Sequence, residues 1–146
     1  MDVTADLDAP HPPGAVFALV EDLARYPTWL DIVPRVVGEP DGAWLVDLRG
    51  RLGPFARSKR LRMVRSRHEP PRTVRFERAE LDGRSHSPWI LDATVEALGT
   101  GSRLTMHLHY GGGLFGPVLE KVLGDEIERS RPRLLAALGE RSHGDG

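Results

Sequence analysis

Hydrophobic and polar residues alternate along most of this chain, and the period of the alternation changes at a few positions. Residues 3–9 alternate with a period of two, which is typical of a half-buried strand, and several prolines follow them. After these prolines, apolar residues recur at spacings of three and four, which predicts a helix that ends before Pro27. Residues 26–34 predict a short turn or a second short helix.

Six further segments alternate with a period of two, and turn signals such as Asp41-Gly42 and Asp82-Gly83 separate them. Two of these predicted strands begin at Val36 and Trp44, and the others comprise residues 58–68, 74–77, 89–97 and 103–110. Helical spacing returns in residues 114–138. The order of one strand, one or two short helices, six strands and a long helix predicts an α+β fold, in which the long helix covers the apolar face of an antiparallel sheet.

The composition fits one domain. The chain has 146 residues, of which 40% are hydrophobic, so it can bury a sizeable core. We expect a single domain over residues 1–140 and a frayed polar tail over residues 141–146. The absence of cysteine excludes disulfides and thiolate metal sites. The apolar runs are too short for a membrane span, and the acidic N-terminus does not resemble a signal peptide, so we expect a cytoplasmic protein without integral membrane association.

The net charge of −1 conceals a basic central segment. Residues 49–84 contain twelve basic and four acidic side chains, whereas residues 1–48 contain two basic and nine acidic ones. A basic segment can bind nucleic acid, but these arginines alternate with apolar residues on predicted strands, as on a solvated sheet face. No nucleic-acid-binding motif is present, so we do not expect a nucleic-acid partner.

The segment 22–29, which ends in Tyr26-Pro27-Thr28-Trp29, is the most specific feature of the sequence. Together with the run of hairpins and the Gly116-Pro117 pair at the start of the last helix, it resembles the START-like, or Bet v 1-like (SRPBCC), helix-grip superfamily. Within it, the chain is similar to the polyketide cyclase/dehydrase and lipid-transport proteins, over residues 2–138. The resemblance implies a seven-stranded sheet curved around the last helix, with an elongated apolar cavity between them. It implies ligands such as polyketides, lipids, sterols or quinones, and no universal catalytic set.

Strand alternation without bulges selects the side chains that face the last helix. The candidate ligand-binding residues are Trp29, Trp44, Met63, Phe76, Trp89, Leu91, Met106, Leu108, Tyr110, Leu119, Leu123 and Ile127. Large aromatic and flexible Met side chains often line a pocket, but the same residues could also interdigitate into a solid core. The hydroxyl of Tyr110 is the one polar tip near the cavity that could orient a ligand.

The arginines of the central segment divide between the two sheet faces. Arg65, Arg67 and Arg78 share the inward alternation near strand ends, so we expect them at the cavity rim, where they could steer an acidic ligand head inward. We expect the outward ones, such as Arg60 and Arg62, to keep the outer face solvated.

Three motifs suggest other chemistry, but the sequence around each of them argues against it. Residues 111–116 match G-x-G-x-x-G, but no second parallel strand follows the helix, so we expect no dinucleotide and no other cofactor. His107 and His109, with His86 as a possible third ligand, could bind a metal, but they share the solvent face of a strand, and we assign no metal site. Residues 85–87 read Ser-His-Ser without a nucleophile elbow.

These patterns favour a protein that binds a small hydrophobic molecule, such as a polyketide, a lipid or a quinone-like compound. A polyketide cyclase or dehydratase acting in the same cavity is the alternative, and an interaction module that uses the basic outer sheet face is a third possibility. The inward positions include no histidine and no paired carboxylates, which favours binding over catalysis, and we assign no catalytic residue. The oligomeric state stays open.

Overall fold

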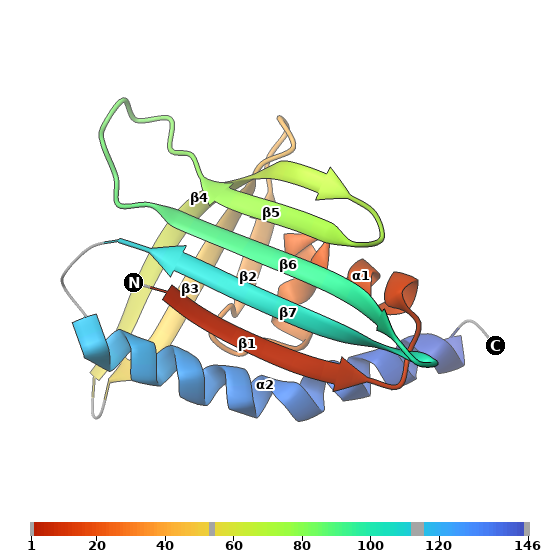
Figure 1. Cartoon of the computed structure of the whole chain (residues 1–146). Helices are drawn as coiled ribbons and strands as arrows, with labels where there is room; N and C mark the ends of the chain where they lie inside the picture. Colours follow the sequence, from red (N-terminus) through yellow and green to blue (C-terminus); the bar gives the residue numbers. More distant parts are fainter. Residues whose placement is uncertain (1, 53–54, 112–115, 145–146) are drawn as a thin grey trace.

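The computed structural model describes the backbone of residues 2–52, 55–111 and 116–144, and the side chains of residues 2–49, 58–111 and 124–139. Seven strands form one sheet in the order β1-β7-β6-β5-β4-β3-β2, and all neighbouring strands are antiparallel (Figure 1). The elements are β1 (Asp2–Ala9), α1 (Pro13–Val20), the 3-10 helix η1 (Leu23–Thr28), β2 (Arg35–Gly38), β3 (Trp44–Leu52), β4 (Phe55–Glu69), β5 (Thr73–Arg78), β6 (Trp89–Leu98), β7 (Gly101–Tyr110) and α2 (Gly116–Gly144).

This architecture confirms the predicted α+β helix-grip fold. In Figure 1, α2 runs lengthwise beside β1, and α1 lies on the far side of the strands β5 to β7. We call the sheet face that packs on the helices the inner face and the opposite one the outer face. The last helix extends to Gly144, so residues 141–144 of the expected tail belong to it, while residues 145–146 lie outside the described residues.

Two connections differ from the predicted ones. The chain does not turn tightly at Asp82-Gly83, because β5 ends at Arg78 and β6 begins only at Trp89, with residues 79–88 between them as an extended loop. In contrast, β3 extends to Leu52 and β4 begins at Phe55, before the start at residue 58 that the sequence predicted, so regular pairing continues through most of residues 50–56.

A β-bulge in β4 changes which side chains face inward. Arg65 pairs with Phe76, but Arg67 pairs with Arg75, so the register shifts by one residue between them. A bulge places two residues opposite one and reverses the alternation beyond it. Arg67 therefore lies on the outer face instead of at the cavity rim, and His68, opposite Val74, lies on the inner face. The expectation that no histidine points inward is wrong for this reason.

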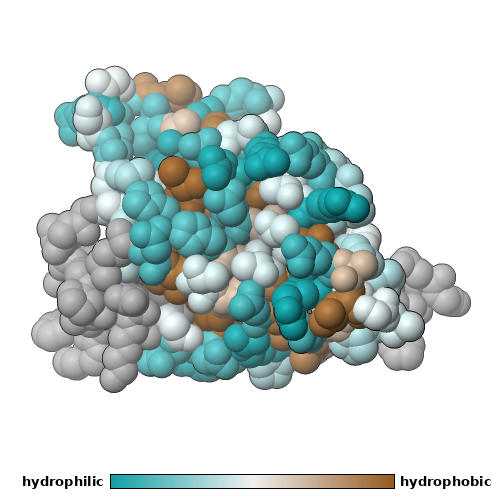
Figure 2. All heavy atoms as spheres, in the orientation of Figure 1, coloured by the Kyte–Doolittle hydropathy of each residue, from teal (hydrophilic) through white to brown (hydrophobic). Residues whose placement is uncertain are grey.

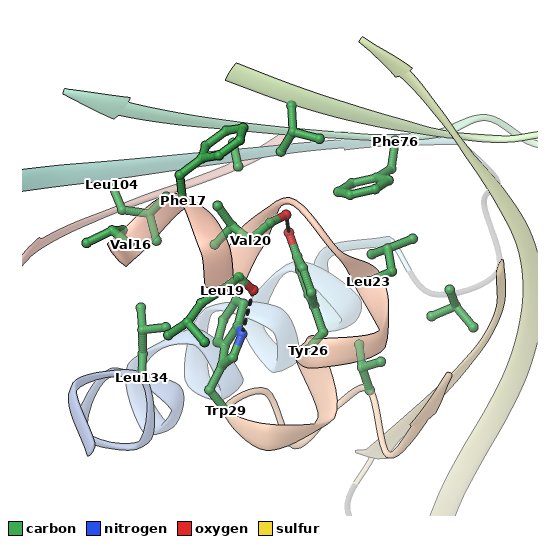
Figure 3. Close-up of a cluster of buried hydrophobic side chains, with 14 of the residues drawn as sticks. Val16, Phe17, Leu19, Val20, Leu23, Tyr26, Trp29, Phe76, Leu104 and Leu134 are labelled. Atoms are coloured by element: carbon green, nitrogen blue, oxygen red, sulfur yellow. Dashed lines mark hydrogen bonds between the residues drawn. The ribbon is translucent and has the colours of Figure 1, made fainter. Parts of the chain in front are cut away.

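A densely packed core occupies one end of the inner face (Figure 3). The ring centroids of Tyr26 and Trp29 lie 4.8 Å apart, and the Tyr26 centroid lies 6.2 Å from that of Phe76 on β5. The Tyr26 hydroxyl donates a hydrogen bond to the Val20 carbonyl at 2.9 Å, and the Trp29 indole N–H donates to the Leu19 carbonyl at 3.3 Å. Because buried polar groups need partners, these bonds allow both rings to be fully buried. The Tyr26-Pro27-Thr28-Trp29 segment thus anchors η1 in the core, and Trp29 belongs to this core.

The outer face is polar, as the view of β1, β7 and β6 in Figure 2 shows. Three of its arginines are paired with carboxylates of neighbouring strands: Arg60 with Asp47 at 2.7 Å, Arg75 with Asp92 at 2.7 Å and Arg103 with Asp8 at 2.8 Å. The arginine of each pair holds the pKa of Asp47 and of Asp8 below the ordinary value by hydrogen bonding. The charges of Arg60 and Arg75 in the basic segment are thus balanced locally, which weakens the idea of an interaction module on a basic outer face.

Arg62 is an exception among the outer-face arginines. Arg62 is only 8% exposed, because Asp41 and the start of the 79–88 loop cover it. Its guanidinium forms an ion pair with Asp41 and donates to the Ala79 carbonyl at 2.8 Å. The expectation that Arg62 keeps the outer face solvated is therefore wrong, since the side chain fastens the loop to β4 instead.

Candidate ligand-binding site

The strand register places the predicted lining residues of the sheet on the inner face. Trp44 lies opposite Met63, and Trp89 lies opposite Tyr110. Further along, Phe76 pairs with Leu91, which pairs with Leu108, and Met106 is paired with Ala93. Strand alternation therefore selected one common face correctly wherever the sheet is regular. From α2, Ile127 is half-buried, while the side chains of Leu119 and Leu123 lie outside the described residues.

Burial is uneven along this face. Val74, Phe76 and Val95, near α1 and η1, are at most 1% exposed. Leu91 and Leu108, although they lie on the interior strands β6 and β7, remain partly exposed. The hydrogen-bonded sheet closes off their outer side, so this accessible surface opens on the inner side, which α2 faces. The inner face is thus fully covered around Val74, Phe76 and Val95, and it is less completely covered at Leu91 and Leu108, which lie beside Phe76 in the same cross-strand row.

Trp89 and Tyr110 form an aromatic wall next to the partly exposed leucines. Their ring centroids are 5.3 Å apart with an interplanar angle of 28°, and the two residues are 8% and 1% exposed. The indole Nε1 of Trp89 is buried and has no hydrogen-bond partner within the described part of the chain. A buried donor of this kind is uncommon in folded proteins and calls for an acceptor.

Charged residues gather beside Trp89 on the inner face. Because β5 stops at Arg78, no β5 residue separates Lys59 of β4 from β6, and the Lys59 Nζ lies 5.8 Å from the ring centroid of Trp89. The Arg78 side chain is 10% exposed, and it donates to Glu80 at 3.0 Å and to the Ser87 carbonyl at 3.4 Å. Arg78 thus lies deeper than the rim position expected from the sequence.

The surroundings lower the pKa values of two members of this charged cluster, Lys59 and Glu80, for different reasons. Desolvation lowers the pKa of Lys59, and the positive charge of Arg78 lowers it further. Burial opposes ionisation of Glu80, but hydrogen bonds from the Arg62 backbone N–H and from Arg78 lower its pKa overall. Lys59 was not among the predicted site residues, although its position two residues before Leu61 on the inward alternation was an available signal.

A separate cleft of about 590 Å³ opens between the end of α1, η1 and the β2–β3 hairpin. Its lining residues are Ala18, Glu21, Asp22, Ala24, Arg25, Gly38, Glu39, Gly42, Ala43, Trp44 and Arg65. The guanidinium of Arg65 lies over the Trp44 ring, 5.8 Å from its centroid, and donates to the Glu21 carbonyl at 2.9 Å. Arg65 therefore lies at this cleft, which is separate from the cavity between the sheet and the last helix whose rim it was expected to form.

The inward histidine adjoins the same cleft. The Nε2 atom of His68 lies 3.1 Å from the Glu21 Oε1, and its ring stacks on Phe17. A histidine oriented by a carboxylate can accept and donate protons, which makes this pair chemically competent. The sequence pattern does not reveal this pair, because the bulge that turns His68 inward leaves no mark in the alternation.

The three histidines considered as metal ligands do not come together, and residues 112–115 of the glycine-rich motif lie outside the described residues. His107 and His109 both contact Asp2, at 2.9 and 3.1 Å, and the hydrogen bond from His109 lowers the pKa of Asp2. His86 contacts Asp82 in the 79–88 loop instead of joining them. Among the described residues, no three His, Cys, Asp or Glu side chains are grouped so as to hold a metal ion. Within the same residues, no helix is long and apolar enough to cross a membrane.

Solved structures with the same fold are numerous. A START superfamily protein from Mycobacterium smegmatis matches with a TM-score of 0.71 and 15% identity, over 95% of this chain and 97% of that one. The protein TTHA0849 from Thermus thermophilus matches with a TM-score of 0.63 and 20% identity, over 100% and 99% of the two chains. The di-domain ARO/CYC StfQ of the steffimycin biosynthetic pathway matches with a TM-score of 0.67 and 16% identity, over 97% of this chain and 51% of that one. At these identities the likeness shows the fold alone.

Sequence comparison identifies the family. No curated protein matches the chain. The profile of the polyketide cyclase / dehydrase and lipid transport family matches residues 1–139, which is nearly the whole chain and includes every strand of the sheet. The chain therefore belongs to the polyketide cyclase / dehydrase and lipid transport family.

Proposed function

We propose that the protein binds a small hydrophobic molecule between α2 and the incompletely covered part of the inner sheet face at Leu91 and Leu108. We call this space the inner hollow, and its sheet wall consists of Leu91, Met106, Leu108, Trp89 and Tyr110. The family supports a function of this kind, since its description names lipid transport and polyketide chemistry. The observation that carries the proposal is the partial exposure of Leu91 and Leu108 on interior strands. An apolar ligand that covers exposed apolar surface removes this surface from water, and this stabilises the complex.

Substitutions that add side-chain volume distinguish a hollow inner face from a solid core. In a hollow, Leu91→Phe and Leu108→Phe find room, so we expect each to change the free energy of unfolding by less than about 0.5 kcal/mol. In a solid core, the same overpacking costs about 1–3 kcal/mol. Val95→Phe in the fully covered part of the face serves as the matched control and should show that cost. Urea unfolding measures all three variants.

The same variants test binding. With decanol as a neutral apolar probe in titration calorimetry, we expect saturable binding to the wild type and a loss of about tenfold or more in both filled variants. A high cost of both filling substitutions, or no binding of an apolar probe by the wild type, would overturn the proposed function.

A second candidate function is acid–base catalysis on a polyketide-like substrate, and the His68–Glu21 pair favours it. In a dehydration, His68 would take the proton next to the carbonyl of a β-hydroxyacyl group. That proton returns to the departing hydroxyl, which leaves as water, and a carbon–carbon double bond forms. The 590 Å³ cleft that Glu21 lines provides access for such a substrate.

A β-hydroxyacyl thioester tests this second function, because the conjugated product absorbs in the ultraviolet. We expect His68→Gln to lower the rate by about 10²-fold or more, as for other general bases. His107→Gln on the outer face is the matched control and should leave the rate unchanged. No turnover by the wild type would eliminate this candidate.

A further inference from the structure

We propose that the occupant of the inner hollow carries an anionic oxygen, such as a carboxylate or a phenolate, which Lys59 and the indole N–H of Trp89 bind together. This inference rests on the proposed function and specifies the ligand class. The hollow would then accept an acidic amphiphile, with its apolar part against Leu91 and Leu108 and its acidic end at the charged cluster.

The indole N–H of Trp89 is a buried donor that lacks an acceptor among the described residues. Trp89 itself is only 8% exposed. The side chain lies on the inner face two residues before Leu91, so it adjoins the incompletely covered surface directly. Since buried donors are nearly always paired, a ligand oxygen is a natural acceptor for this group.

The ammonium of Lys59 lies close to the same indole ring. It is 5.8 Å from the ring centroid, and within the described part of the chain no carboxylate forms an ion pair with it. Glu80 is the nearby acid that acts on it, but that carboxylate is already engaged by Arg78 and by the Arg62 backbone N–H. Lys59 thus keeps its charge available for a ligand.

The cluster of Lys59, Arg78 and Glu80 carries an excess of positive charge. Lys59 and Arg78 contribute two positive charges, and Glu80 contributes one negative charge. Arg78 also donates to the Ser87 carbonyl, so it is held in place and contributes chiefly its field. An excess positive charge beside a buried N–H donor favours an anion over a neutral polar group, because charge-assisted hydrogen bonds are the stronger ones.

Decanoate and decanol are matched probes, since they share the alkyl chain and differ in the head group. In titration calorimetry at neutral pH, we expect the wild type to bind decanoate about tenfold or more tightly than decanol. Lys59→Met should weaken decanoate binding about tenfold and leave decanol binding within about twofold. Trp89→Phe keeps the aromatic surface but removes the donor, and it should weaken decanoate binding about fivefold.

Arg60→Met is the matched control, because it removes one positive charge from the same strand on the outer face. It should leave the affinity for decanoate unchanged. Independently of any substitution, raising the salt concentration should weaken decanoate binding to the wild type and leave decanol binding unaffected.

The outcomes distinguish the two proposals. Equal affinities for decanoate and decanol in the wild type would overturn the anion inference while the proposed apolar binding stands. An effect of Arg60→Met as large as that of Lys59→Met would also overturn it, because net charge would then explain the preference. If neither probe binds, the proposed function is overturned, and the anion inference with it.

Discussion

His68 of β4 stacks on Phe17 of α1, with ring centroids 5.9 Å apart and an interplanar angle of 11°. The β-bulge between Arg65 and Arg67 makes this contact possible, because a regular strand would direct His68 to the outer face. The ring also contacts Glu21 at the end of α1, so the bulge joins the sheet to the first helix.

This contact predicts unequal effects of two neighbouring substitutions. His68→Ala removes the stacking on Phe17 and the bond to Glu21, and we expect it to lower the free energy of unfolding by about 1–2 kcal/mol. Arg67→Ala, on the exposed outer face, should change it by less than about 0.5 kcal/mol. Urea unfolding followed by circular dichroism measures both, and equal effects would contradict the bulged register.

The buried position of Arg62 predicts a second difference between neighbours. Arg62→Met removes the ion pair with Asp41 and leaves the Ala79 carbonyl without this donor, so we expect a loss of about 1–3 kcal/mol in unfolding free energy. Arg60→Met removes a solvent-exposed pair and should cost clearly less than Arg62→Met, because water and salt screen the charges of an exposed pair. We also expect faster proteolysis of the 79–88 loop in Arg62→Met, which limited trypsin digestion can detect. Similar stability and digestion of the two variants would argue against the fastening role.

The hydroxyl of Tyr26 predicts a third effect. Tyr26→Phe keeps the ring in the core but removes the bond to the Val20 carbonyl, and we expect a loss of about 1–2 kcal/mol. Thr28→Val removes a hydroxyl bond to the Arg25 carbonyl at an exposed position, where water replaces it, so it should cost less than about 0.5 kcal/mol. Thermal unfolding that shows no difference between the two variants would contradict this account.

The ion pair of Asp8 with Arg103 predicts a dependence of stability on pH. The hydrogen bond from Arg103 lowers the pKa of Asp8 below its ordinary value of 3.8, so the unfolded chain binds this proton more readily than the folded one. The stabilisation is therefore complete well above pH 3.8 and is lost as the pH falls below that value through the lowered pKa of the folded state.

Melting temperatures measured between about pH 6 and pH 2.5 test this dependence. Asp8→Asn and Arg103→Met should each flatten the acid limb of the profile by the same amount, because either change removes the pair. An unchanged acid limb in Asp8→Asn would show that the pair contributes nothing to stability.

The alternation of polar and apolar residues determined which strand residues share a face wherever pairing is regular. Leu91 and Leu108 were predicted to face the last helix, and their register agrees, because a side-chain period of two is a local property of an extended backbone. The turn at Asp41-Gly42 is likewise local, since the positive φ of 90° at Gly42 suits a residue without a side chain.

Only the tertiary structure decided the positions that depend on a partner strand or loop. The bulge in β4 arises from pairing with β5, so the sequence of β4 alone could not place Arg67 outside and His68 inside. The early end of β5 brings Lys59 to Trp89, and the loop that follows buries Arg62. Alternation along one strand carries no information about such neighbours, because register and coverage are properties of two segments together.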